Sequence, residues 1–447
     1  MPHPSAEFTL AYIDQASFLG LRALGRGPLA QFTWVYEHPV DLNGLRRFHR
    51  DLAYGLLGRL VERSVLPFGR HHWVALPHPA EMAITTSTLP RAAVPAWSED
   101  QIRQPVDPEW GPPWRLAVAP IEGGGAAVTL VASHTLCDGL GMSLAIADAA
   151  KGIRCDLGYP PPNARTLAQA LREDAGRALR AIPEMLTAAA AAIRVARANA
   201  AQVSSSAARA TPPASLSDSQ PVIPPSLAVY LDAAEWDACA EKLSGTSNSL
   251  FAGIAARLGR NIGRVDTDGR AELSIPVSER IEGDTRGNAL TAMLVKVDPG
   301  EVTTTLVGVR AEIKRNLAEL ARTPRDLLAP LPLTPLVPRR LARRLEGLAL
   351  GSGVTIGCSN LGELDPAVNR PDGTDADYLS ARQIESRITA DVLDRMGGML
   401  FLASGRVHGR VFLTVSAWRV GGPNGREALA EQAAGVLAEF GMRGRIE

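Results

Sequence analysis

A Pro- and Ser-rich stretch near the middle of the chain divides the sequence into two regions that alternate between strand-like and helix-like patterns. This stretch, SSSAARATPPASLSDSQPVIPPS (204–226), offers little apolar surface for a core. A chain of 447 residues is also longer than a typical single core supports. The sequence therefore predicts an N-terminal domain over 1–165, a helical crossover and linker over 166–226, and a C-terminal domain over 227–447.

Each region mixes strands with helices, as the spacing of its apolar residues indicates. The expected strands are 31–40, 124–133, 227–232, 270–280, 290–298, 353–360 and 410–418, and the expected helices are 42–62, 233–243, 247–263 and 426–440. A helix rich in Ala, Arg and Leu over 166–202 is expected to break at Pro183. Residues 361–409 are expected to be rich in loops. The pattern predicts an α/β fold in which each domain is a sheet covered by helices.

Composition narrows the class of partner and the compartment. The chain has 47 basic and 47 acidic residues, so no overall field attracts nucleic acid or an anionic membrane. The four cysteines lie far apart without CxxC spacing, which is typical of reduced thiols rather than of disulfides or a zinc site. The N-terminal stretch has no secretory leader, and no apolar stretch approaches the roughly 18 residues of a membrane-spanning helix. We therefore expect a cytoplasmic protein.

The motif SHTLCDG (133–139) lies where a buried strand is expected to end and a helix to begin. This position projects the His134 side chain from the rim of a sheet, where binding and catalytic groups are frequent. Gly139 permits a turn or a close approach of the backbone. The residues alone leave two interpretations open: a functional histidine, or an ordinary strand-end histidine followed by Asp138 as a helix N-cap.

Five motifs, in order along the chain, resemble those of the chloramphenicol acetyltransferase-like superfamily, whose signature is HHxxxDG. SHTLCDG is similar to this signature except that Ser133 replaces its first histidine. The other four are GPPWRLAV (111–118), TSNSLFAGIAARL (246–258), SIPVSERIEGDTRGNALTAMLVKV (274–297) and TIGCSNLGEL (355–364). The set resembles most closely the wax ester synthase/diacylglycerol acyltransferase branch, with condensation domains as the other close branch. AYIDQASFLGL (11–21) faintly resembles the N-terminus of that first branch.

The resemblance implies two sandwich-like domains in a pseudo-dimeric arrangement, with the active site at their interface. It also implies an acyltransferase that moves an acyl group from acyl-CoA or a phosphopantetheinyl carrier protein to a hydroxyl or amine, with no permanently bound cofactor. Imidazole suits a general base because its ordinary pKa of about 6.5 leaves it mostly unprotonated at neutral pH. His134 is the expected base for direct attack by the acceptor, and Cys137 is the rival nucleophile.

The resemblance implies supporting roles for further residues. Asp138 is expected to pair with Arg280 and hold the loop in shape; the alternatives are that Asp138 orients His134 directly and that Arg280 is a solvated charge. Backbone N–H groups near Gly139 and the Asn360 side chain are candidate oxyanion donors, although Asn360 also suits a turn. The other candidate residues at the site are Ser133 and Ser359.

Three departures from the family pattern leave the substrate open. Ser133 replaces a histidine, Ser249 stands in the aspartate position beside Asn248, and the strand end at 359–364 lacks two prolines. They support a second hypothesis, a catalytically degenerate binding module that recruits a carrier protein or a partner enzyme. An intact HxxxDG together with Arg280 and Asn360 favours the enzyme.

Three other stretches are interpreted as structural. FGRHHWVALPHP (68–79) has three histidines but no carboxylate or cysteine to complete a metal site, so no metal is expected. PRRLARRLEG (338–347) suits a solvated helix face; the alternatives are contact with a coenzyme A phosphate, a carrier protein or anionic lipid. IEGGGAAV (121–128) lacks the spacing of a dinucleotide site and suits a hairpin turn. The expected partners are thus a small acyl acceptor, with a carrier protein and peripheral lipid contact left open.

Overall fold

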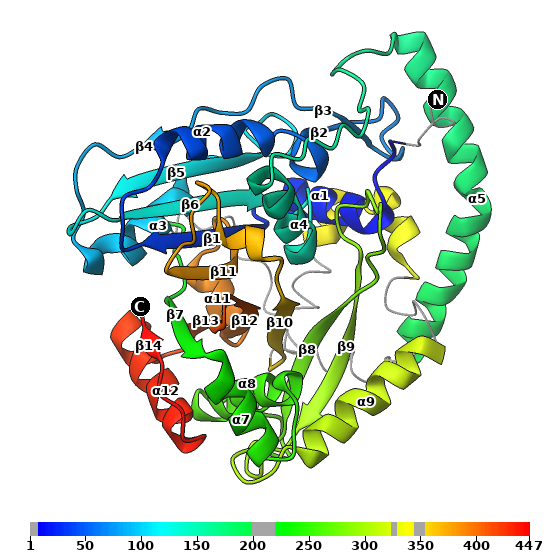
Figure 1. The fold of residues 1–447 in the computed structure, drawn as a ribbon. Helices are drawn as coiled ribbons and strands as arrows, with labels where there is room; N and C mark the ends of the chain where they lie inside the picture. Colours follow the sequence, from blue (N-terminus) through cyan, green and yellow to red (C-terminus); the bar gives the residue numbers. More distant parts are fainter. Residues whose placement is uncertain (1–7, 199–219, 323–328, 344–353) are drawn as a thin grey trace.

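The computed structural model describes residues 8–198, 220–322, 329–343 and 354–447, and it contains three β-sheets covered by helices (Figure 1). The two large sheets belong to two subdomains in a pseudo-dimeric arrangement, as the sequence led us to expect. Each has its own apolar core. The mixed strands and helices confirm the α/β fold class.

The N-terminal subdomain is built on a five-stranded sheet in the order β11-β1-β6-β5-β4. Its strands are β1 (Pro28–Tyr36), β4 (Ala83–Ile84), β5 (Trp114–Pro120), β6 (Ala126–Ser133) and β11 (Tyr378–Glu385). A two-stranded sheet, β2 (Arg59–Glu62) and β3 (His72–Ala75), lies beside it. The helices of this subdomain are α1 (Tyr12–Leu24), α2 (Leu42–Asp51), α3 (Val94–Arg103) and α4 (Gly139–Ala150).

The C-terminal subdomain is built on a seven-stranded sheet in the order β14-β7-β13-β12-β10-β8-β9. Its strands are β7 (Ser226–Asp232), β8 (Ala271–Ser278), β9 (Leu290–Val297), β10 (Ile356–Glu363), β12 (Met399–Val407), β13 (Arg410–Trp418) and β14 (Arg445–Ile446). The helices of this subdomain are α7 (Ala233–Lys242), α8 (Ser247–Asn261), α9 (Val307–Arg322), α11 (Ala390–Arg395) and α12 (Arg426–Glu439). Among them, α8 packs on β8 and β10 and contacts α7, α9 and α12.

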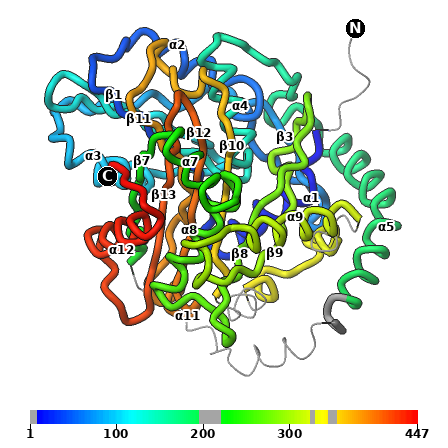
Figure 2. The backbone as a smooth tube through the Cα atoms, turned by 60° about the horizontal axis from the view of Figure 1, so that its bottom comes forward, coloured from blue at the N-terminus to red at the C-terminus, as the bar shows by residue number. Residues whose placement is uncertain are grey.

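Strand β11 joins the two subdomains. It comes from the C-terminal part of the chain, yet it pairs with β1 of the N-terminal sheet, and it also packs against β12 and β13. The expectation that 361–409 is loop-rich is therefore wrong, because β11, α11 and β12 lie within this segment. Figure 2 shows β11 next to β1 from a second direction.

Two predicted elements differ in the structure. The helix expected over 42–62 ends at Asp51, and 59–62 forms β2, because the chain turns at Gly55 (φ +63°). A Cβ on Gly58 would lie 2.3 Å from the Ala53 carbonyl oxygen. The expected break at Pro183 is also absent: α5 (Leu167–Ala198) continues through this residue. Pro183 is exposed, so water can satisfy the carbonyl that its missing N–H leaves free.

Other expectations agree with the structure or fall outside it. The glycines at 123–125 form the hairpin turn between β5 and β6, with φ of +86° at Gly123 and +89° at Gly124. Most of the Pro- and Ser-rich stretch falls within 199–219, outside the described residues. Within the described ranges, no helix combines the length and the apolar character that a membrane crossing requires.

The central strand of the N-terminal sheet carries the candidate motif. All eight residues of β6 are buried between β1 and β5, which explains its nearly continuous apolar sequence. The strand ends at Ser133, and α4 begins six residues later at Gly139. Residues 133–139 therefore follow the C-terminal end of the central strand and lie next to the β8–β9 connection of the C-terminal subdomain.

Candidate functional site

The connection between β6 and α4 presents one accessible side chain. The His134 backbone N–H donates to the Pro28 carbonyl at 3.0 Å, which continues the pairing of β6 with β1. Ser133 is buried, and its hydroxyl accepts a bond of 3.4 Å from the Thr135 N–H. In the stretch 131–138, His134 alone is not buried. His134 is therefore the one residue of 131–138 that is partly exposed.

Asp138 holds the start of α4 and binds the other subdomain at the same time. Its Oδ1 accepts from the Gly141 N–H at 2.7 Å, which is the bond of a helix N-cap. Its Oδ2 accepts from Nη2 of Arg280 and from the Ala289 N–H, both at 2.8 Å. The carboxylate is thus engaged by α4 and by the β8–β9 connection. It does not orient His134 through a hydrogen bond among the contacts of the described residues.

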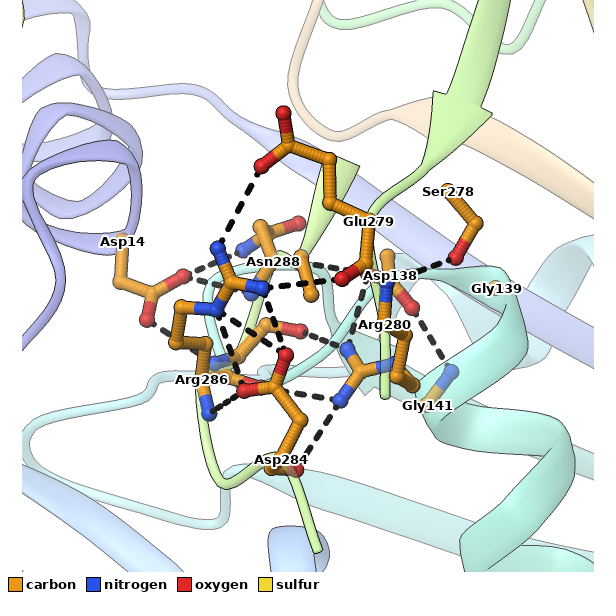
Figure 3. Close-up of polar contacts among 12 residues, drawn as sticks. Asp14, Asp138, Gly139, Gly141, Ser278, Glu279, Arg280, Asp284, Arg286 and Asn288 are labelled. Carbon is orange, nitrogen blue, oxygen red and sulfur yellow. Dashed lines mark hydrogen bonds and ion pairs between the residues drawn. The ribbon is translucent and has the colours of Figure 1, made fainter. Parts of the chain in front are cut away.

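Arg280 is buried rather than solvated, and its side chain is 6% exposed. Besides Asp138, its guanidinium donates to the carbonyl oxygens of Asp284, Arg286 and Gly287, the last at 2.8 Å (Figure 3). It therefore fixes the whole 279–289 connection against the motif. The expected ion pair between Asp138 and Arg280 is present, and it crosses the subdomain interface.

Asp14, which the sequence analysis did not select, lies in the same network. It is fully buried on α1 and accepts from the Gly287 N–H at 2.9 Å and from the Asn288 N–H at 2.7 Å. The Asn288 side-chain amide bridges Asp14, at 2.9 Å, and the His134 carbonyl, at 3.1 Å. Burial raises the pKa of Asp14 despite the nearby Arg59 charge. Its faint signal was the segment AYIDQASFLGL, which resembles a family N-terminus.

Arg59 is a second residue that the sequence analysis missed, because it falls in the wrongly predicted helix. It is fully buried at the start of β2, with its guanidinium 3.8 Å from the ring centroid of Trp73. It donates to the carbonyl of Leu136, at 2.6 Å, and to that of Thr285, at 2.7 Å. These two bonds join the motif to the β8–β9 connection, as the bonds of Arg280 also do.

The backbone of this connection fits tightly at Gly287. A Cβ at this position would lie 2.7 Å from the Leu136 carbonyl oxygen, 2.9 Å from Oδ1 of Asp14 and 3.0 Å from the Thr135 carbonyl oxygen. Its own carbonyl accepts from the Asp138 N–H at 3.0 Å. A glycine is therefore required here by close approach.

The electrostatic environment favours a neutral imidazole and a neutral thiol. Burial lowers the pKa of His134 below its ordinary 6.5, and the Asp138 charge, the residue's own carbonyl and Asn288 oppose this shift. Burial raises the pKa of the Cys137 thiol to about 12, and this residue is 1% exposed. Cys137 is consequently a poor nucleophile, whereas the neutral form of His134, which carries a free lone pair for a proton, is favoured.

Gly139 brings the end of β10 to the motif. A Cβ on Gly139 would lie 2.7 Å from Cδ2 of Leu361, so the first turn of α4 and β10 are in contact. Ser359 and Asn360 precede Leu361 on β10 and are partly exposed. The Asn360 amide donates to Oδ1 of Asn248, and Asn360 Oδ1 accepts from the Gly362 N–H at 3.0 Å. Asn360 therefore forms a turn and pairs with Asn248, rather than contacting His134.

One motif departure, Ser249, and one retained motif, that of Pro113 and Trp114, have structural explanations. Ser249, in the aspartate position, completes a capping box with Thr246 at the start of α8. Trp114 is buried and donates to the Leu57 carbonyl at 2.9 Å, while the Pro113 carbonyl accepts from the Ser133 N–H at 3.0 Å. Both Pro113 and Trp114 thus shape the strand pair.

The histidines of 68–79 have structural partners. The His71 ring accepts from the Ser64 N–H at 3.2 Å, and the His72 ring pairs with Asp174 at 3.0 Å. Across the part of the chain that the structure describes, no group of three or more His, Cys, Asp or Glu side chains is arranged to hold a metal ion.

No family model and no curated protein sequence matches this chain significantly. Solved structures match over nearly its whole length. Polyketide synthase associated protein 5 from Mycobacterium tuberculosis is 14% identical over 98% of this chain and 99% of that chain, with a TM-score of 0.55. The first condensation domain of the CDA synthetase is 16% identical over 99% and 100%, with a TM-score of 0.57.

A third match is the wax ester synthase/diacylglycerol acyltransferase from Marinobacter aquaeolei VT8. It is 14% identical over 97% of this chain and 98% of that chain, with a TM-score of 0.54. The alignments span both subdomains, so the likeness includes their arrangement. The chain therefore shares the fold of condensation domains and of a wax ester synthase/diacylglycerol acyltransferase, as its resemblance to the chloramphenicol acetyltransferase-like superfamily implied.

Proposed function

We propose that this protein is an acyltransferase that moves an acyl group from a thioester to a hydroxyl or amine, with His134 as the general base. The observation that carries the proposal is the position of His134: it is the partly exposed residue in an otherwise buried connection that Arg59, Arg280 and Asn288 hold in place through hydrogen bonds. The acyltransferase-like fold supports the same reaction class.

The reaction needs one base that can also act as an acid. The neutral His134 ring takes the proton from the acceptor hydroxyl or amine while the acceptor attacks the thioester carbonyl carbon. The tetrahedral intermediate then expels the thiolate, and the imidazolium returns the proton to sulfur. One ring nitrogen of the neutral imidazole carries a hydrogen, and the other acts as the base.

The negative charge that develops on the carbonyl oxygen requires donors. The start of α4 offers the positive end of the helix dipole at Gly139, directly after the loop that Asp138 shapes. We assign the Gly139 N–H as the first donor. Asn360 remains a secondary candidate, because it would first have to leave Asn248. Ser133 and Ser359 are assigned supporting positions beside these groups.

The donor is proposed to be acyl-CoA or an acyl group on a carrier protein. The compared structures include a polyketide synthase associated protein and a nonribosomal peptide synthetase. Thioesters suit a histidine base whose pKa is lowered, since a thiolate is a good leaving group and requires less protonation than an alkoxide. The proposed reaction requires no permanently bound cofactor, because the acyl carrier is a co-substrate.

The test is a panel of acyl-CoA thioesters and synthetic pantetheine thioesters, each offered with alcohols and amines. Free thiol is followed continuously, and the ester or amide product is identified by mass spectrometry. We expect thiol release that depends on the acceptor and matches product formation mole for mole. A Cys137→Ala variant is expected to retain this activity, because the thiol takes no part in the reaction.

The second candidate function is a binding module without catalysis. The hydrogen bond from Asn360 to Asn248 favours it, because the Asn360 amide is then not free to donate to an oxyanion. Absence of thiol release with every donor and acceptor, together with binding of a carrier protein, would establish this candidate and reject the enzyme. Thiol release without any acceptor, lost in the Cys137→Ala variant, would instead show covalent catalysis.

A further inference from the structure

Helix α5 carries large apolar side chains on a face that the protein leaves uncovered. It runs along one edge of the molecule, apart from both large sheets (Figures 1 and 2). Its buried residues are small or polar: Ala170, Asp174, Ala181, Ala188 and Ala191. Its leucines and isoleucines, by contrast, are between 43% and 68% exposed: Leu167, Leu171, Leu179, Ile182, Leu186 and Ile193. The usual arrangement of an amphipathic helix on a globular protein is the reverse.

The exposed apolar residues share one side of the helix. At 3.6 residues per turn they fall within an arc of roughly 120°, and the stretch from Leu167 to Ile193 extends for about 39 Å. We call this set the α5 stripe. Contiguous apolar surface of this length in contact with water marks an interaction site. Because the α5 stripe is straight and extended, it fits a flat surface better than a surface with pockets.

Arginines flank the α5 stripe on one side, and the acids of the helix already have partners. Arg172, Arg180 and Arg194 are exposed and form no ion pair within the described residues. In the same rotational projection Arg172, Arg194 and Arg180 lie roughly 20°, 60° and 100° beyond one border of the stripe, between the stripe and the buried alanines. The three acids are engaged: Asp174 with His72 and Arg165, Glu173 with Arg165 and Arg177, and Glu184 with the Tyr12 hydroxyl.

A neighbouring segment adds the same combination. The 3-10 helix η3 (Leu331–Leu336) packs against α5, and Leu336 and Leu341 are exposed. Arg339 and Arg340, from the arginine run noted in the sequence, are also exposed. Although the whole chain is electrically neutral, this edge of the molecule combines apolar and cationic groups.

We infer that α5 lies flat on anionic lipid membranes, with the α5 stripe inserted at the boundary of headgroups and acyl chains and the arginines at the phosphates. An in-plane amphipathic helix binds through these two terms together. A second copy of the chain fits less well, because it would bring the same uncompensated arginines to the contact. The contacts of Asp174 with His72 and of Glu184 with Tyr12 hold α5 to the rest of the protein. They do not involve the residues of the α5 stripe.

Cosedimentation with lipid vesicles tests this inference. The full-length protein is mixed with phosphatidylcholine vesicles and with vesicles that also contain phosphatidylglycerol, at low and high salt. We expect binding to the anionic vesicles that weakens at high salt. The variants Leu179→Ser/Leu186→Ser and Arg172→Glu/Arg194→Glu are each expected to bind about tenfold more weakly, since each removes one of the two contributions.

The matched control is Leu42→Ser/Val420→Ser, which removes two exposed apolar side chains at the start of α2 and beside α12, away from α5 (Figure 1). It is expected to bind like the wild type. Circular dichroism shows whether each variant is folded. Because the inference is independent of catalysis, His134→Ala is expected to bind vesicles normally.

Failure of the wild type to sediment with either vesicle would overturn the inference. So would equal binding by the wild type and the serine variant of α5. A concentration-dependent dimer in light scattering, lost in that serine variant while vesicle binding is absent, would assign the α5 stripe to a second copy instead.

Discussion

Replacing His134 by alanine or by glutamine is expected to lower the rate of acyl transfer by roughly a hundredfold to ten-thousandfold, which is the usual contribution of a positioned general base. The reason is that no other titratable group in 131–138 is accessible: Asp138 is engaged by three donors, and the Cys137 thiol is buried. Glutamine retains hydrogen bonding but cannot take a proton at neutral pH, so both variants should lose similar activity.

The measurement is the rate of acceptor-dependent product formation with the best thioester from the panel. The exposed His78, changed to alanine, serves as the control and is expected to retain full activity. Urea unfolding of each variant separates catalysis from stability. If His134→Ala transferred the acyl group as fast as His78→Ala, the assignment of the base would be wrong.

The variant Arg280→Met is expected to lower the free energy of unfolding by about 3–5 kcal/mol, because it leaves the buried Asp138 carboxylate without its charged partner. Activity should fall as well, since the bonds of Arg280 to the carbonyls of Asp284, Arg286 and Gly287 are lost together. Urea unfolding at neutral pH gives the first quantity, and acyl transfer under folded conditions gives the second.

The neighbouring Arg286 offers a matched control for this variant. It pairs with Asp284 at 2.6 Å, and its own side chain is 37% exposed although that of Asp284 is 7% exposed, so Arg286→Met is expected to cost about 1–2 kcal/mol, less than Arg280→Met. Adding Asp138→Asn to Arg280→Met should restore part of the lost stability, because asparagine still caps α4 and leaves no unpaired charge. Equal losses for Arg280→Met and Arg286→Met would contradict the role given to the buried pair.

The sequence was sufficient where local patterns decide the structure. The junction of β6 and α4 was predicted because a buried strand and a helix each have a distinct period, and because an aspartate and a glycine mark the helix start. The partner of Asp138 came from the resemblance, since the two paired residues are 142 positions apart. Local sequence patterns do not indicate which residues pair at such a separation along the chain.

The missed features share this cause. Asp14 contacts Asn288 across 274 positions, and β11 pairs with β1 after a separation of more than 300 residues, so neither contact leaves a local pattern. Arg59 was hidden for a different reason. Apolar residues in 42–62 fit a helical period, and the turn at Gly55 overrides this preference and starts a strand at Arg59.

The most direct test of a neutral His134 as the base is the dependence of kcat/KM on pH. Burial lowers the pKa of His134, and the neutral ring is the active form, so activity is lost as the pH falls through that lowered value. We predict an acidic limb with an apparent pKa below the ordinary 6.5 of histidine, absent from the residual activity of His134→Gln. A limb at or above 6.5, unchanged in His134→Gln, would contradict the account.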